Sequence, residues 1–201
     1  QMQALADMVR RFGFVSPENI LTPQGYKDIY GGTLMERIGA RITRVERGEL
    51  STEDWTVKGA VPFLNALRAR GVTLYLASGT DQEHVLHEAE ILGYAPLFEG
   101  RIYGAVGDVR KYTKKMVIDR IIQENNLSGP ELIALGDGPV EIRETKKRGG
   151  ITIGIASDEI RRFGLNPEKR ARLIRAGADL VVPDFSNPGA LLAYLFDEAR
   201  P

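Results

Sequence analysis

The chain has 201 residues, of which 43% are hydrophobic and 27% are charged, and its 27 basic residues balance its 27 acidic ones. This composition excludes a disordered chain, and the length is sufficient for one domain, with or without a smaller appended one. A formal net charge of zero supplies no long-range field to gather nucleic acid or an anionic membrane, so we expect neither partner. An anionic ligand would need a local site, and a small ligand suits this balance better than a polyanion.

The sequence contains no cysteine, which excludes disulfides, cysteine-ligated zinc and a thiol nucleophile. No apolar run approaches the ~20 residues that a membrane span needs, and residues 1–14 lack the apolar segment of a signal peptide. We therefore expect a cytoplasmic protein. Only two histidines are present, so carboxylates, hydroxyls and lysines are the expected reactive groups.

Helical spacing of apolar residues dominates residues 1–51, where we expect helices and no strand. Ser16-Pro17 and Thr22-Pro23 are typical of helix starts, and Gly31-Gly32 is expected to interrupt the helical run. After Gly59, helices alternate with short apolar strands. The expected helices cover residues 61–70, 81–92, 113–125, 140–148 and 166–176, and the expected strands cover residues 72–77, 97–103, 131–135, 151–156 and 180–182. This alternation predicts an α/β fold in which helices cover both faces of a parallel sheet.

Two strand ends carry candidate binding groups, because ligands in open α/β sheets gather beyond the carboxyl ends of the strands. Ser78-Gly79-Thr80 follows the strand 72–77, at a turn where a hydroxyl and exposed amides can hold a phosphate oxygen. Asp137 follows the strand 131–135, and Glu141 comes four residues later. Two carboxylates in this arrangement favour Mg²⁺, which prefers oxygen ligands.

A cluster of lysines, Lys111, Lys114 and Lys115, lies at the start of the helix before the acidic strand end, where an ammonium group can neutralise phosphate charge. Each of these features also has an ordinary explanation: a serine after a strand is often a helix cap, lysines are often solvated, and an aspartate between glycines can be a turn residue. The basic residues of the stretch 161–175 are offset by nearby acidic ones, so we interpret them as a solvated helix face. It is the order of the three candidate features along the chain that favours a functional site.

That order of strand-Ser, helix-Lys and strand-Gly-Asp-x-x-x-Glu resembles the haloacid dehalogenase superfamily, specifically its phosphatases with a helical cap. Ser78 lies where the second motif of the family has Ser or Thr. Lys114 fits the lysine of the third motif, and Gly136-Asp137-Gly138-Pro139-Val140-Glu141 fits the acidic fourth motif. Lys114 is preferred because its spacing from Asp137 is similar to that of the family, with Lys111 as the alternative.

The resemblance implies a Rossmann-like α/β core over residues 59–201, preceded by a partial helical cap over residues 1–58. It also implies Mg²⁺-dependent hydrolysis of a small phosphorylated substrate through an aspartyl-phosphate. The implied phosphate-binding residues are Ser78, Gly79, Thr80 and Lys114, and the implied metal-site residues are Asp137 and Glu141.

The first motif of the family, an apolar strand followed by Asp-x-Asp-Gly-Thr that supplies the nucleophile, is absent from this sequence. Asp184 follows an apolar strand but leads into Phe-Ser-Asn, so we expect an ordinary turn there. We therefore expect an inactive, N-terminally truncated piece of a phosphatase. The alternative is a noncatalytic module of the same fold that binds a phosphorylated ligand or partner.

The absent strand has a structural consequence. In the resembling fold it lies between the strands 72–77 and 131–135, so its loss would expose backbone groups on both neighbours. Direct pairing of those neighbours, a strand from a second copy, or residues outside this numbering could close the gap. Self-association through the gap is accordingly one expected partner interaction.

Overall fold

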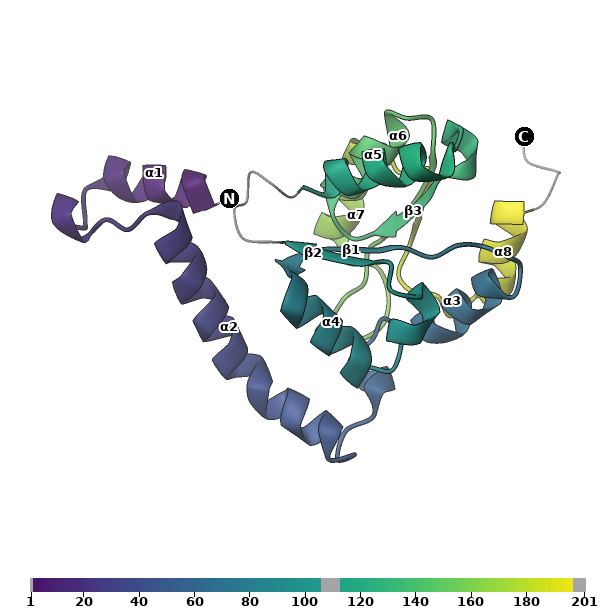
Figure 1. Cartoon of the computed structure of the whole chain (residues 1–201), viewed down its shortest axis with the longest axis horizontal. Coiled ribbons are helices and arrows are strands. Elements are labelled where there is room, and N and C mark those ends of the chain that lie inside the picture. The colour runs from purple at the N-terminus through teal and green to yellow at the C-terminus, as the bar shows by residue number, and fades with distance from the viewer. Residues whose placement is uncertain (1, 106–112, 197–201) are drawn as a thin grey trace. The chain divides into compact units, whose positions relative to one another are not determined.

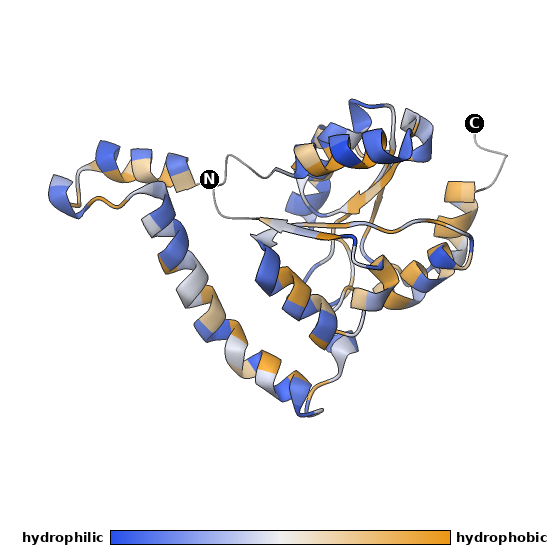
Figure 2. Ribbon diagram, viewed as in Figure 1, coloured by the Kyte–Doolittle hydropathy of each residue, from blue (hydrophilic) through white to orange (hydrophobic). Residues whose placement is uncertain are grey.

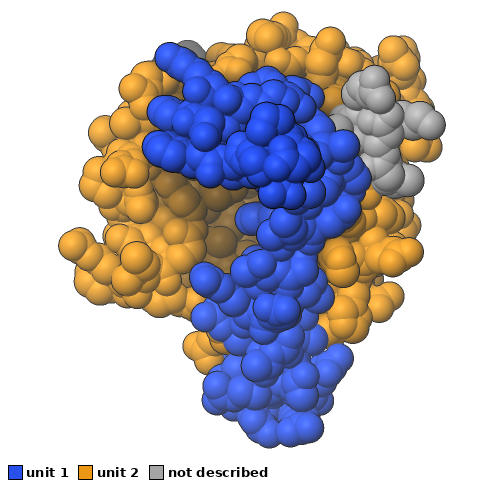
Figure 3. All heavy atoms as spheres, turned by 90° about the vertical axis from the view of Figure 1, so that its left-hand side faces the viewer, with its two compact units in different colours: residues 1–51 blue, residues 52–201 orange. Residues whose placement is uncertain are grey.

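The computed structural model describes residues 2–105 and 113–196 (Figure 1). Contacts divide the chain into two compact units, residues 1–51 and 52–201, which Figure 3 shows in separate colours. The assignment of a cap over residues 1–58 and a core over residues 59–201 stays a prediction. None of the described helices is both long and apolar enough to cross a membrane.

The first unit is helical, with α1 (Met2–Phe12), the 3-10 turn η1 (Pro17–Asn19) and α2 (Pro23–Glu46). Thr22 caps α2, because its hydroxyl accepts a hydrogen bond from the Gly25 amide at 3.1 Å. The predicted break at Gly31-Gly32 is wrong, since α2 continues through both glycines. A glycine costs a helix only about 1 kcal/mol relative to alanine, which the remaining hydrogen bonds of a 24-residue helix offset.

The second unit alternates helices and parallel strands, which confirms the predicted α/β fold. Its α-helices are α3 (Ala60–Arg68), α4 (Gln82–Ile91), α5 (Lys114–Asn125), α6 (Pro139–Lys146), α7 (Pro167–Ala176) and α8 (Pro188–Phe196). Its strands are β1 (Leu76–Asp81), β2 (Ile102–Ala105), β3 (Ile133–Gly136), β4 (Ile151–Ile155) and β5 (Leu180–Val182), and its 3-10 turns are η2 (Thr52–Asp54), η3 (Ala95–Phe98) and η4 (Gly129–Glu131). Sequence reasoning missed α8.

The first two strands begin later than predicted. β1 starts at Leu76 because its partner β2 starts only at Ile102, and these two residues lie opposite each other. Part of the range expected for the second strand instead forms η3, a turn that Pro96 favours. Consequently the segment Ser78-Gly79-Thr80 lies inside β1 rather than after it, where the register with β2 shifts between Ala77 and Asp81.

The strands form two separate parallel sheets, β1-β2 and β3-β4-β5. Within the described residues, β1 and β3 each have one edge without a strand partner, so these two strands do not close the expected gap by pairing directly. Leu76 of β1 packs against the same hydrophobic cluster as Ile133 and Leu135 of β3. β3 is half-buried along its length, whereas β4, which is paired on both sides, is buried from Thr152 onward. The two open edges therefore border one shared core.

That core joins helices and strands from the whole second unit. Phe63 and Ile153 are completely buried, and the rings of Phe63 and Phe185 stack with their centroids 5.0 Å apart. Apolar residues are concentrated in β3 and α8 (Figure 2). Gly59 has a φ of +74° and precedes α3, and a Cβ there would lie 2.6 Å from the carbonyl oxygen of Phe185. Only glycine fits this approach of backbone to backbone.

Asp179 ties the start of β5 to β4 and α6. Its Oδ2 accepts hydrogen bonds from the amide and hydroxyl of Thr152, each at 2.9 Å, and its Oδ1 is paired with Lys146. Partial burial acts to raise the pKa of Asp179, but the hydrogen bonds from Lys146 and Thr152 outweigh it and leave the pKa below its ordinary value of 3.8. The carboxylate is therefore stabilised in its charged form.

Candidate functional site

The end of β3 leads through Asp137 directly into α6. Glu141, in the first turn of α6, folds back so that its Oε1 accepts a hydrogen bond from the Gly138 amide at 3.0 Å. This contact satisfies one of the amides that a helix leaves free at its start. A Cβ on Gly136 would lie 2.6 Å from the same Oε1, so the glycine at position 136 makes room for the carboxylate.

Lys114 begins α5 and reaches this carboxylate. Its Nζ lies 3.0 Å from Oε1 of Glu141, and the two side chains are 27% and 13% exposed. Thr113 fixes the start of α5 by accepting a hydrogen bond from the Met116 amide. Lys115 instead lines a different hollow, together with Glu144, Lys147 and Arg148. The structure thus brings Lys114 rather than Lys115 to Glu141, and Lys111 lies outside the described residues.

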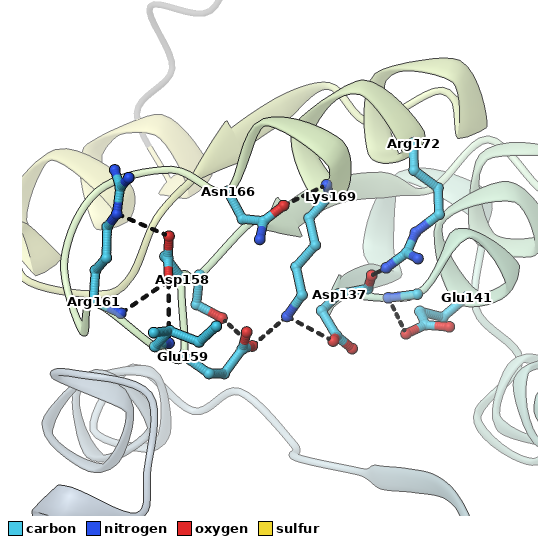
Figure 4. Close-up of polar contacts among 11 residues, drawn as sticks. Asp137, Glu141, Asp158, Glu159, Arg161, Asn166, Lys169 and Arg172 are labelled. Carbon is cyan, nitrogen blue, oxygen red and sulfur yellow. Dashed lines mark hydrogen bonds and ion pairs between the residues drawn. The ribbon is translucent and has the colours of Figure 1, made fainter.

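α7 supplies two further groups to the strand end (Figure 4). The Nζ of Lys169 lies 3.2 Å from Oδ2 of Asp137 and also pairs with Oε1 of Glu159. Arg172, one turn further along α7, donates to the carbonyl oxygen of Asp137 at 3.2 Å. The interpretation of this basic stretch as a solvated face is therefore wrong for Lys169, which is partly buried, whereas Arg172 is exposed as expected but still donates to Asp137. Their three-residue spacing on one helix face was the signal available in the sequence.

The charges of this cluster stabilise one another. Partial burial acts to lower the pKa of Lys169, but hydrogen bonds and charge from Glu159 and Asp137 outweigh it, so the pKa lies above its ordinary value. Burial likewise acts to raise the pKa of Glu159, and the hydrogen bonds from Lys169 and Ser157 outweigh it and lower the pKa. Lys169 is accordingly a cation held between two carboxylates that come from different loops.

Ser78 is half-buried in β1, and its Oγ accepts a hydrogen bond from the Thr80 amide at 3.1 Å. Gly79 and Thr80 are exposed. In the part of the chain that the structure describes, Ser78 makes no hydrogen bond to Lys114 or Asp137. The predicted residues thus fall into one group joined by the Lys114–Glu141 pair after β3 and a separate group within β1.

Asp184 follows β5 in an ordinary turn. Its Oδ1 accepts a hydrogen bond from the Ser186 amide at 2.8 Å, which is the local pattern of an aspartate that begins a turn. This geometry agrees with the interpretation of Asp184 as a structural residue.

The donor set after β3 can be compared with the needs of a hard cation. Among the described residues, no group of three or more acidic or histidine side chains is placed to hold a metal ion. Oε1 of Glu141 is engaged by Lys114 and Gly138, whereas the Asp137 side chain is 60% exposed. Mg²⁺ often binds through one or two carboxylates and takes water and phosphate oxygens as its other ligands. The residues are therefore compatible with Mg²⁺, for which Asp137 offers an exposed carboxylate.

The fold and these residues define a parallel α/β protein with a cluster of opposite charges at the carboxyl end of β3. The sequence profile of the haloacid dehalogenase-like hydrolases matches residues 24–149. This match covers more than half of the chain, and the chain belongs to that family. No sequence among curated proteins gives a match.

Solved structures support the same fold. A haloacid dehalogenase family hydrolase from Deinococcus radiodurans, crystallised with phosphate and sodium, has a TM-score of 0.60 and 20% identity, over 96% of this chain and 74% of that one. A haloacid dehalogenase-like protein of unknown function from Agrobacterium tumefaciens has a TM-score of 0.58 and 18% identity, over 96% and 90% of the two chains.

A predicted phosphatase from Clostridium acetobutylicum has a TM-score of 0.54 and 22% identity, over 67% of this chain. The present chain spans 58% of the length of that protein. At these identities the similarities establish the fold, and the profile match establishes membership of the haloacid dehalogenase-like family.

Proposed function

We propose that this protein is part of a Mg²⁺-dependent phosphatase that hydrolyses small phosphomonoesters through an aspartyl-phosphate. The observation that carries the proposal is the contact between Lys114 and Glu141 beside Asp137, at the carboxyl end of β3. In the resemblance to the family, Lys114 matches the third motif, and Asp137 and Glu141 match the fourth.

Each residue has a task in this proposal. The Ser78 hydroxyl and the amides of Gly79 and Thr80 would donate hydrogen bonds to nonbridging oxygens of the phosphate, which requires the Thr80 amide to leave the Ser78 oxygen to which it now donates. The ammonium group of Lys114 would offset the charge spread over the phosphoryl group during transfer.

Asp137 would ligate the metal, and Glu141 would hold Lys114 in place while it caps α6. Bound Mg²⁺ supplies positive charge that lets an anionic nucleophile approach an anionic phosphate. Phosphoryl transfer needs such positive charge beside the phosphate oxygens, and Lys114 and the metal would supply it here.

The nucleophile is the remaining requirement. We propose that it comes from an extended segment between β1 and β3, each of which has one edge without a strand partner among the described residues. A parallel strand there would satisfy backbone groups on both sides and bury apolar side chains against the shared cluster. In this proposal the segment precedes the present sequence in a longer chain, and the 201 residues alone are inactive.

The experiment compares phosphate release from an aryl phosphate by the 201-residue chain and by a chain extended upstream, both with Mg²⁺. We expect turnover only from the extended chain. Asp137→Asn in that chain should lower turnover by orders of magnitude with folding retained. Activity of the short chain would place the nucleophile within these residues and refute the proposal.

The oligomeric state is part of the same test. If the short chain dimerises and the extended chain does not, a strand from a second copy closes the gap in the short chain. If both chains are inactive but bind inorganic phosphate, the noncatalytic binding module replaces the phosphatase. Size-exclusion chromatography with light scattering and phosphate-binding calorimetry provide these readouts.

A further inference from the structure

The ammonium group of Lys169 contacts the Asp137 carboxylate, so a metal cation that binds this carboxylate would have to compete with Lys169. Its Nζ is 3.2 Å from Oδ2 of Asp137, and its side chain is only 16% exposed. The same Nζ also pairs with Oε1 of Glu159, in the loop that follows β4. Figure 4 shows the ammonium group between the two carboxylates.

The helix start fixes this position. Asn166 is the N-cap of α7, and its Oδ1 accepts a hydrogen bond from the Lys169 amide at 3.0 Å. Arg172 lies one turn further on and donates to the carbonyl oxygen of Asp137. α7 is therefore attached to Asp137 at two points, one on the backbone and one on the carboxylate. A lysine on a solvated surface typically forms at most one weak ion pair, without a second contact between the same two elements.

Glu159, the second carboxylate beside Lys169, is also fixed by hydrogen bonding. Oε1 of Glu159 accepts a hydrogen bond from the Ser157 hydroxyl at 2.9 Å as well as pairing with Lys169. Glu159 can thus keep the ammonium group when the Asp137 carboxylate turns away. Lys169 can pair with Asp137 or with Glu159. The carboxylate that it leaves can then bind another cation.

We propose that Lys169 is a built-in counter-ion that a divalent cation must displace from Asp137, and that Glu159 receives Lys169 when this happens. This inference rests on the proposed assignment of Asp137 as a metal ligand. Lys169 is a positioning residue in this scheme, because it acts through Asp137. Metal affinity then depends on two residues outside the motifs of the family, and they act in opposite directions.

The test measures Mn²⁺ binding to the 201-residue chain by electron paramagnetic resonance of the free ion. Lys169→Met should lower the Kd for Mn²⁺ about tenfold, the size expected when a partly buried ion pair no longer competes. Glu159→Gln should raise the Kd, because Lys169 then has Asp137 as its one carboxylate partner. Arg170→Met removes the same charge from the adjacent, exposed position of α7 and should change the Kd less than twofold, or ~0.4 kcal/mol.

Each outcome of the Mn²⁺-binding experiment either supports or overturns the proposal. Tighter binding in Lys169→Met with weaker binding in Glu159→Gln supports the proposal. Equal affinity in wild type and Lys169→Met, including no binding by either, overturns it, as does an equal gain in Arg170→Met. Thermal unfolding verifies the fold of each variant. If Lys169→Met does not fold, Glu159→Gln decides, since unchanged or tighter binding there overturns the proposal.

Asp137→Asn separates this inference from the proposed function. If that variant loses Mn²⁺ while Lys169→Met binds like wild type, Asp137 is a ligand and the counter-ion proposal alone fails. If Asp137→Asn binds Mn²⁺ as wild type does, the metal assignment within the proposed function fails. The phosphatase assay of the extended chain decides the activity independently of both results.

Discussion

Breaking the ion pair between Lys114 and Glu141 should cost the protein about 1–2 kcal/mol in free energy of unfolding. The two charged atoms lie 3.0 Å apart, and side-chain exposures of 27% and 13% shield them from most of the solvent. This places the pair above the 0.2–1 kcal/mol typical of exposed pairs and near the lower end of charge-assisted hydrogen bonds, at ~1.5 kcal/mol. Lys114→Met and Glu141→Gln, singly and together, make a double-mutant cycle. The glutamine retains an oxygen for the Gly138 amide, so the cycle reports the ion pair rather than the helix cap.

Urea unfolding of the four proteins gives the coupling energy. Lys115→Met is the matched control, because Lys115 is adjacent in α5 but lines a different hollow. Its cycle with Glu141→Gln should show coupling below about 0.5 kcal/mol, the usual limit for independent sites. A coupling energy between Lys114 and Glu141 below about 0.5 kcal/mol would refute the placement of Lys114 at the Glu141 carboxylate. An equal coupling energy between Lys115 and Glu141 would refute it as well.

Three further changes test contacts elsewhere in the second unit. Thr145→Val should stabilise the protein by about 1 kcal/mol in urea unfolding, because the buried Thr145 hydroxyl has no hydrogen-bond partner among the described residues; a loss of stability would reveal a partner. Gly59→Ala should destabilise by about 2 kcal/mol or more, since φ is +74° and the new Cβ would meet the Phe185 carbonyl; a change below about 0.5 kcal/mol would contradict this. Asp179→Asn should cost about 1–2 kcal/mol at pH 7 through the lost pairing with Lys146. Because the folded pKa is lowered, this stabilisation is present above pH 3.8 and is lost as the pH falls through the folded pKa. Thermal unfolding of both proteins from pH 7 to pH 2 should therefore show a shrinking difference, and a constant one would argue against the charge of Asp179 as the cause.

Local signals in the sequence predicted most helices of the second unit. Thr113 and Asn166 cap α5 and α7 with their side chains, as expected of these residue types at helix starts. Gly31-Gly32 shows the limit of such signals, because propensity alone does not end a helix that the neighbouring turns continue. β1 shows another limit, since its extent depends on where its partner β2 begins. Strand bounds are set by pairing, which the sequence of one strand does not contain.

By itself, the sequence determined the α/β class and the family, because periodicity, caps and motif spacing are local properties of the chain. It also predicted the gap beside β1 and β3 through the absence of the first motif. Only the tertiary structure decided that Lys114 rather than Lys115 meets Glu141, and that Lys169 reaches Asp137 from α7. These contacts join segments that lie 27 or more positions apart in the sequence, and they depend on how the helices pack against the strands. Charge partners of this kind follow from packing, so Lys169 looks solvated in the sequence but is paired with two carboxylates in the fold.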